Sequence, residues 1–280
     1  MIKRTFDAIG TKWQIDIYEN ISSSNEEEIF RIIDERIRVF DKDYSRFRND
    51  SLVTEMSKKI GDYVLPADAK IMMDLYEDIY RLTDGLVTPL IGNLISDAGY
   101  DANYSLKQKG KLSTPPKWEE ALEYSFPKLK IKIPVILDFG AAGKGYLIDI
   151  VGKILEDNDI KAFCIDAGGD ILHRGSESIR IGLENSTNSD EVIGIVNIKN
   201  QSICGSSGNR RVWGDFNHII NPKTLSSPKD ILAVWTISET TLIADAMSTC
   251  LFFVKPEIME EKYKKNYHIF YNYCNVWNYF

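Results

Sequence analysis

The sequence is poor in the residues that cross-link small folds, since its 280 residues include only four cysteines and three histidines. The cysteines are widely spaced and form no Cys-x-x-Cys pair, which argues against a structural zinc site, a redox dithiol and a disulfide framework. A chain of this length can bury a sizeable core without such links. This cysteine usage fits a reducing compartment.

The sequence also lacks an excess of positive charge, because 41 acidic residues outnumber 34 basic ones and give a net charge of -7. We therefore expect no nucleic-acid partner, and any phosphate must be bound locally. No apolar run reaches the ~18 residues that a membrane span requires. The first residues resemble neither a signal peptide nor a lipid-attachment site, so the sequence as written predicts a cytoplasmic protein without a membrane span.

What the sequence does contain is periodic apolar patterning of two kinds. Helical spacing predicts helices over residues 25–40, 67–82, 144–155 and 240–252. Shorter apolar or alternating segments predict strands over residues 13–18, 135–139, 162–167, 179–183, 192–198 and 231–237. Early helices and later hairpin-like strands indicate an α+β fold with a largely antiparallel sheet core and packed helices.

No repeat or long linker divides the chain, so we expect a single domain over residues 1–280. The alternative is two intimately joined lobes with a soft boundary near residue 130. The aromatic-rich tail over residues 267–280 could close the core or dock a partner.

A glycine-rich segment, Asp138-Phe-Gly-Ala-Ala-Gly-Lys-Gly-Tyr146, lies where a predicted strand ends and a helix begins. Free backbone N–H groups at such a position can hold an anion, and Lys144 adds a positive charge. The spacing matches neither a P-loop nor a dinucleotide-binding fingerprint. A phosphate-binding loop and a plain turn with a surface lysine both remain open.

Two further segments carry candidate chemistry. The first is a predicted helix capped by Ser238, on which Asp245 and Thr249 lie one turn apart and could ligate Mg²⁺ or form an ordinary solvated pair. The second holds His218, a candidate general base that could equally be structural. Glycine-containing turns over residues 167–170 and 206–209 could bring backbone close to a ligand or only reverse the chain.

Taken in order, these segments resemble the ApbE family of FAD:protein FMN transferases from about Ile9 to Val254. The matching motifs are Ile9-Gly-Thr11, Tyr44-Ser-Arg-Phe-Arg-Asn-Asp-Ser51, Asp138 to Tyr146, Ala167-Gly-Gly-Asp170, Ser206-Ser-Gly-Asn209, His218-Ile-Ile-Asn-Pro-Lys-Thr224 and Ala244-Asp-Ala-Met-Ser-Thr249. The resemblance implies an ApbE-like (T-fold-like) architecture. It also implies an Mg²⁺-dependent transferase that moves FMN from FAD to a Ser or Thr hydroxyl of an acceptor protein and releases AMP.

The resemblance also assigns roles to individual residues. It implies catalytic roles for His218 and Asp245. It places FAD against Ile9, Phe47, Leu86, Val87, Thr88, Asp138 and Lys144. It implies Mg²⁺ ligation by Asp245, Thr249 and the backbone carbonyl of Ala141.

The chain departs from the family pattern at four positions. Thr88 and Asn221 replace two common Asp residues, Arg210 replaces an aromatic residue, and Leu225 replaces a glycine. Because carboxylates are lost beside the expected site, we expect pocket details or acceptor choice to differ from the family. Two alternative functions stay open. One is an FAD pyrophosphatase, in which water replaces the acceptor hydroxyl and FMN and AMP are released. The other is a non-catalytic flavin-binding protein, which the absence of Asp at position 88 slightly favours.

Overall fold

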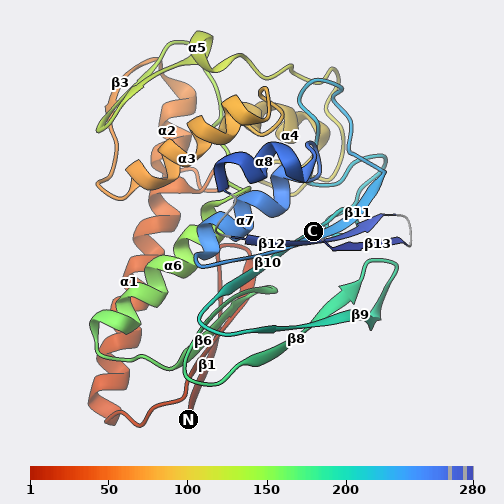
Figure 1. Ribbon diagram of the computed structural model, residues 1–280. Helices are drawn as coiled ribbons and strands as arrows, with labels where there is room; N and C mark the ends of the chain where they lie inside the picture. Colours follow the sequence, from red (N-terminus) through yellow and green to blue (C-terminus); the bar gives the residue numbers. More distant parts are fainter. Residues whose placement is uncertain (264–266, 274–275, 280) are drawn as a thin grey trace.

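An eight-stranded sheet organises the computed structural model, which describes residues 1–263, 267–273 and 276–279 (Figure 1). Its strands in spatial order are β1 (Ile2–Ala8), β2 (Thr11–Ile17), β6 (Phe163–Ala167), β7 (Asp170–Arg174), β10 (Ser202–Ser207), β11 (Ile231–Ser238), β12 (Tyr267–Tyr273) and β13 (Val276–Tyr279). Every neighbouring pair in this order is antiparallel. The predicted α+β class with an antiparallel core is confirmed.

Three helices cover one face of this sheet, namely α1 (Ser23–Tyr44), α6 (Gly143–Asp157) and α7 (Thr241–Cys250) (Figure 1). The predicted helical periodicity explains this packing, because the apolar side of α1 buries Ile29, Ile33 and Ile37. The Ser22 hydroxyl caps α1 by accepting the N–H of Asn25. α6 packs on both α1 and α7 and therefore lies between these two helices.

A second group of elements lies at the upper end of the molecule in Figure 1. It contains α2 (Leu52–Lys58), α3 (Ala69–Leu82), η1 (Pro89–Ile91), α4 (Gly92–Ala98), α5 (Trp118–Ala121) and a small antiparallel sheet of β3 (Gly61–Val64), β5 (Lys128–Ile131) and β4 (Leu122–Ser125). α8 (Pro256–Tyr263) follows α7. No helix in the described part of the chain has the length and apolar character needed to cross a membrane.

The hairpin of β8 (Ile179–Asn185) and β9 (Asn188–Ile198) lies on the other face of the main sheet (Figure 1). An apolar cluster that includes Leu183, Val196, Ile203 and Ile237 joins the hairpin to that sheet. The aromatic tail contributes backbone to the sheet through β12 and β13. Its side chains, and residues 264–266, 274–275 and 280 as a whole, lie outside what the structure describes.

The predicted strand over residues 135–139 is wrong, and the segment is irregular. Its apolar side chains do alternate between buried and partly exposed positions, but its backbone joins no ladder. The N–H of Ile136 is donated to the Asn93 side chain and that of Asp138 to the Pro89 carbonyl. The glycine-rich segment therefore follows an irregular stretch rather than a strand.

Candidate functional site

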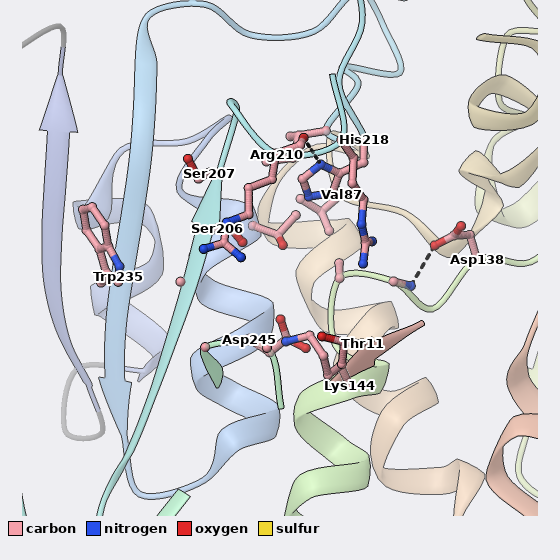
Figure 2. A pocket seen from close by; sticks show the side chains of 18 of the residues that line it. Thr11, Val87, Asp138, Lys144, Ser206, Ser207, Arg210, His218, Trp235 and Asp245 are labelled. Carbon is pink, nitrogen blue, oxygen red and sulfur yellow. Dashed lines mark hydrogen bonds between the residues drawn. The ribbon is translucent and has the colours of Figure 1, made fainter. Parts of the chain in front are cut away.

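A cavity of about 880 Å³ lies between the helices, the main sheet and the β8–β9 hairpin (Figure 2). It brings together nearly all of the predicted site residues. These are Phe47, Leu86, Val87, Thr88, Asp138, Ala141, Lys144, His218, Asp245 and Thr249. Ile9 is not among the lining residues, since it occupies the β1–β2 turn at a φ of 43°, and Thr11 lines the cavity instead.

Asp138 is held by protein groups at the cavity wall. Its Oδ1 accepts the N–H of Gly140 at 2.7 Å, and its Oδ2 forms an ion pair with Arg46. Arg46 is buried and also donates to the Tyr100 carbonyl at 2.8 Å. Asp138 therefore fixes the start of the glycine-rich loop. Its partner Arg46 is a further site residue, to which the sequence motifs assign no role.

Lys144 forms an ion pair with Asp170, which lies at the start of β7 and is almost fully buried. Asp170 Oδ1 also accepts the N–H of Gly205 at 3.3 Å. The sequence predicts a turn over residues 167–170 that either brings backbone close to a ligand or only reverses the chain, and it does not single out the Asp170 carboxylate. The acidic residue directly after two glycines is the one sequence feature that could have pointed to Asp170. Its pairing with Lys144 becomes visible only in the folded structure.

The Lys144–Asp170 pair gives a stability prediction. Replacing Lys144 by Met should leave a buried carboxylate unpaired and lower the free energy of unfolding by about 3 kcal/mol. Adding Asp170→Asn should recover most of this loss, because the uncompensated charge is then removed. Urea unfolding of the two variants measures both steps, and a single variant as stable as the parent protein would contradict the pairing.

Asp245 lies in α7 against the first turn of α6. Its Oδ2 accepts the N–H of Gly145 at 2.8 Å, so a carboxylate from one helix caps the other. The helices approach so closely that a Cβ on Gly145 would lie 2.3 Å from the Thr241 carbonyl oxygen. Burial raises the pKa of the Asp245 carboxyl, and the charge of Lys144 opposes that shift.

The α7 cap differs from the predicted one. Ser238 ends β11, and Thr240 is the N-cap, accepting the N–H of Ile243 at 3.4 Å. Asp149 of α6 accepts the first two N–H groups of α7 at 2.8 Å each. Two α6 contacts, at Asp149 and Gly145, thus fix the position of the helix that carries Asp245.

The three predicted metal ligands all line the cavity: the Ala141 backbone, Asp245 and Thr249. A carbonyl, a carboxylate and a hydroxyl are hard oxygen donors, and Mg²⁺ usually takes few protein ligands and keeps waters or phosphate oxygens. The described residues contain no group of three or more His, Cys, Asp and Glu side chains suited to a metal ion. A carboxylate together with a hydroxyl and a backbone carbonyl is a donor set that fits Mg²⁺.

His218 lines the cavity at a fixed orientation. Its Nδ1 lies 3.1 Å from the Arg210 carbonyl oxygen, and because a carbonyl only accepts, Nδ1 must carry the hydrogen (Figure 2). Burial, and next the charge of Arg211, lower the pKa of His218 to about 4. The imidazole is therefore neutral near pH 7, with Nε2 free to accept a proton.

An aromatic wall closes the cavity near Phe47. The Phe47 and Tyr104 rings stack at 5.1 Å, and Tyr100 meets Phe47 edge-on at 5.4 Å. The Arg46 guanidinium lies 4.1 Å from the Phe47 ring centre, and that of Arg211 lies 5.7 Å from the Tyr100 ring centre. Phe47, Tyr100, Arg46 and Arg211 line the cavity, so this wall presents aromatic and cationic surface to a ligand.

The structure accounts for two of the four family departures. Thr88 Oγ1 accepts the N–H of Leu90 and caps η1, a hydrogen bond that a hydroxyl makes as well as a carboxylate would. The Asn221 side-chain oxygen accepts the N–H groups of Lys223 and Thr224 at 2.8 and 3.1 Å. An amide oxygen makes these turn bonds as well as a carboxylate would.

The other two departures have different outcomes. Arg210 forms an ion pair with Glu184 of β8 at 2.8 Å and so joins the hairpin to the segment that orients His218. Leu225 adopts a φ of 56°, a conformation that favours glycine, and its side chain packs against the apolar cluster that includes Leu94, Trp213 and Ile220.

The comparisons with family models and with known proteins point to the same family. The model of the ApbE family matches residues 9–270. A FAD:protein FMN transferase from Escherichia coli K12 is 22% identical over 282 residues, covering 90% of this chain and 78% of the relative. The Haemophilus influenzae protein of the same name is 24% identical, covering 86% and 74%. The Rhodobacter capsulatus one is 22% identical over 89% of this chain, which spans only 51% of that relative.

Solved structures agree in fold. The flavin transferase ApbE from Vibrio cholerae superimposes with a TM-score of 0.82 at 16% identity, covering 100% of this chain and 96% of that one. The ApbE protein from Thermotoga maritima gives a TM-score of 0.83 at 19% identity, covering 99% and 96%. These likenesses establish the architecture predicted from the motifs.

Proposed function

Because the chain belongs to the ApbE family, we propose that it is a transferase that moves the FMN half of FAD to a Ser or Thr hydroxyl of an acceptor protein. The observation that carries the proposal is the meeting of three features in one cavity: the donor set for Mg²⁺, the Lys144 cation and a neutral His218. Each supplies a different requirement of phosphoryl transfer.

The FAD donor would lie across the cavity with its flavin against the aromatic wall at Phe47. Lys144 would face the pyrophosphate, where it offsets negative charge that builds up as the phosphorus–oxygen bond breaks. Ala141, Asp245 and Thr249 would hold Mg²⁺, which supplies further charge neutralisation to the pyrophosphate when bound. Asp138 and Arg46 keep the loop that carries Ala141 in place.

His218 would act as the general base for the acceptor. Its Nε2 takes the proton of the Ser or Thr hydroxyl while the hydroxyl oxygen attacks the FMN phosphorus. A new phosphoester bond forms, the bond to the bridging oxygen breaks, and AMP leaves with that oxygen. The hydrogen bond from Nδ1 to the Arg210 carbonyl supports this role, because it fixes the required tautomer.

The function is tested by incubating the protein with FAD, Mg²⁺ and a candidate acceptor domain. Intact-mass spectrometry should find one FMN added to the acceptor, and chromatography should find an equal amount of AMP. Equal release of free FMN and AMP, unaffected by the acceptor, would identify a pyrophosphatase instead. Stable FAD binding without turnover under any divalent cation would identify a flavin-binding protein.

The His218 pKa gives a pH prediction. At saturating Mg²⁺, kcat/KM for FAD should be nearly constant between pH 6 and 8, because a base with a pKa of about 4 stays unprotonated there. Below that pKa, the rate should fall about tenfold per pH unit as Nε2 becomes protonated. His218→Gln should lower the rate by about 10²- to 10⁴-fold and remove this limb. A break near pH 6.5 would show an ordinary, solvated histidine.

A further inference from the structure

Tyr76 lies in the middle of α3, is fully buried, and has no role in the chemistry described so far. Its ring packs edge-on against Phe139 at 5.4 Å. Its hydroxyl oxygen accepts the backbone N–H of Ala141 at 3.2 Å. A buried tyrosine hydroxyl normally needs a hydrogen-bond partner, and this one finds it in the backbone of the glycine-rich loop.

The two peptide groups that flank Ala141 are therefore both held. The N–H of Ala141 points to Tyr76, and the N–H of Ala142 is donated to the Phe139 carbonyl at 3.2 Å. In a trans peptide the carbonyl points opposite to the N–H of the next residue. The Ala141 carbonyl is thus directed away from the Phe139 oxygen and has a fixed orientation.

That carbonyl is left free by the way α6 begins. The first-turn N–H of Gly145 is donated to Asp245, and the N–H of Tyr146 goes to the Ala142 carbonyl. Within residues 1–263, 267–273 and 276–279, no hydrogen bond reaches the Ala141 carbonyl. A backbone acceptor without a protein partner at a cavity wall is available to a cation.

We propose that Tyr76 is a positioning residue for the metal. By holding the Gly140–Ala141 peptide through the Ala141 N–H, it fixes the residue whose carbonyl, in the next peptide, can ligate a divalent cation together with Asp245. The inference rests on the proposed function for the identity of the cation. Beyond that function, it assigns to a residue of α3 the role of supporting a metal ligand. Partners that orient metal ligands in this way typically change metal affinity by about 10- to 100-fold when removed.

The test is Tyr76→Phe, which removes one oxygen and keeps the buried ring. The matched control is Tyr80→Phe, one turn further along α3, because the Tyr80 hydroxyl likewise accepts a backbone N–H, that of Trp118, at 3.1 Å. Mn²⁺ binding to each protein in the presence of FAD is measured by electron paramagnetic resonance. The Mg²⁺ concentration that gives half-maximal FMN transfer is measured in parallel.

Tyr76→Phe should weaken Mn²⁺ binding by about 10-fold and raise the half-maximal Mg²⁺ concentration equally, with the rate largely restored at saturating Mg²⁺. Tyr80→Phe should change neither value. Equal Mn²⁺ affinity in Tyr76→Phe and the unmodified protein would overturn the proposal for Tyr76 alone. Absence of Mn²⁺ binding in the unmodified protein would instead overturn the proposed function.

A second measurement covers the case in which Tyr76→Phe does not fold. In the unmodified protein, hydrogen exchange at the Ala141 amide should slow when Mg²⁺ and FAD bind, because ligation of the carbonyl stiffens the same loop. Exchange at the Trp118 amide should not respond. An Ala141 exchange rate that is unchanged by Mg²⁺ and FAD would overturn the inference.

Discussion

Asp245→Ala is expected to reduce FMN transfer by about 10³-fold or more, because it removes the only carboxylate of the proposed Mg²⁺ site. It should also remove the group that caps α6, since Asp245 Oδ2 accepts the N–H of Gly145. An unsatisfied buried N–H costs about 1–3 kcal/mol. Loss of activity in this variant alone would therefore mix a chemical effect with a structural one.

Asp245→Asn separates the two effects. Its side-chain oxygen can still accept the Gly145 N–H, but its NH₂ group would face the cation. Burial raises the pKa of Asp245, so the charged form is disfavoured in the fold, and a neutral amide should leave the melting temperature of the metal-free protein unchanged or higher. Transfer should nevertheless fall about as far as in Asp245→Ala. Near-normal transfer by Asp245→Asn would contradict the metal role.

The longer helices could be predicted because their burial follows the helical period. The buried residues of α1 include Ile29, Ile33 and Ile37, and those of α3 include Met72, Tyr76 and Ile79. Period-based reasoning needs no tertiary information in such cases. It missed β1, an edge strand in which no residue is fully buried, because only a strong alternation of burial marks a strand in sequence.

The erroneous strand over residues 135–139 shows the limit of that reasoning. Val135, Leu137 and Phe139 are buried and alternate with less buried neighbours, which is the pattern of a strand. The pattern reports which side chains reach the core, whereas a strand also needs a neighbouring backbone. Here Asn93 and Pro89 accept the backbone N–H groups instead, and neither partner can be read from the local sequence.

Site residues that carry the chemistry themselves could be predicted from the sequence. Site residues that act through a partner could not. Lys144 and His218 were found from their type and setting. Asp170 and Arg46 were not, because their importance comes from ion pairs with residues far away in sequence. Tyr76 lies within the predicted helix over residues 67–82 but has no pattern that singles it out, and its contact with Ala141 depends on how α3 packs.

Gly145→Ala is the second substitution expected to have a large effect. Alanine normally stabilises a helix interior by about 1 kcal/mol relative to glycine. Here its Cβ would lie 2.3 Å from the Thr241 carbonyl oxygen and 2.7 Å from the Asp245 Cβ. The helices must move apart, so we expect a net loss of about 1–3 kcal/mol in the free energy of unfolding. The displacement of Asp245 should lower FMN transfer by about 100-fold.

Gly143→Ala is the matched control, because Gly143 lies in the same first turn of α6 and its added Cβ would meet Phe139 at an ordinary 3.5 Å. The helix preference for alanine should then dominate, leaving stability equal or slightly higher. The melting temperature and the transfer rate should both fall in Gly145→Ala, whereas neither should fall in Gly143→Ala. If both behaved alike, the close contact between α6 and α7 would not be what holds Asp245 in place. The two glycines look equivalent in the sequence, and only the distance to α7 distinguishes them.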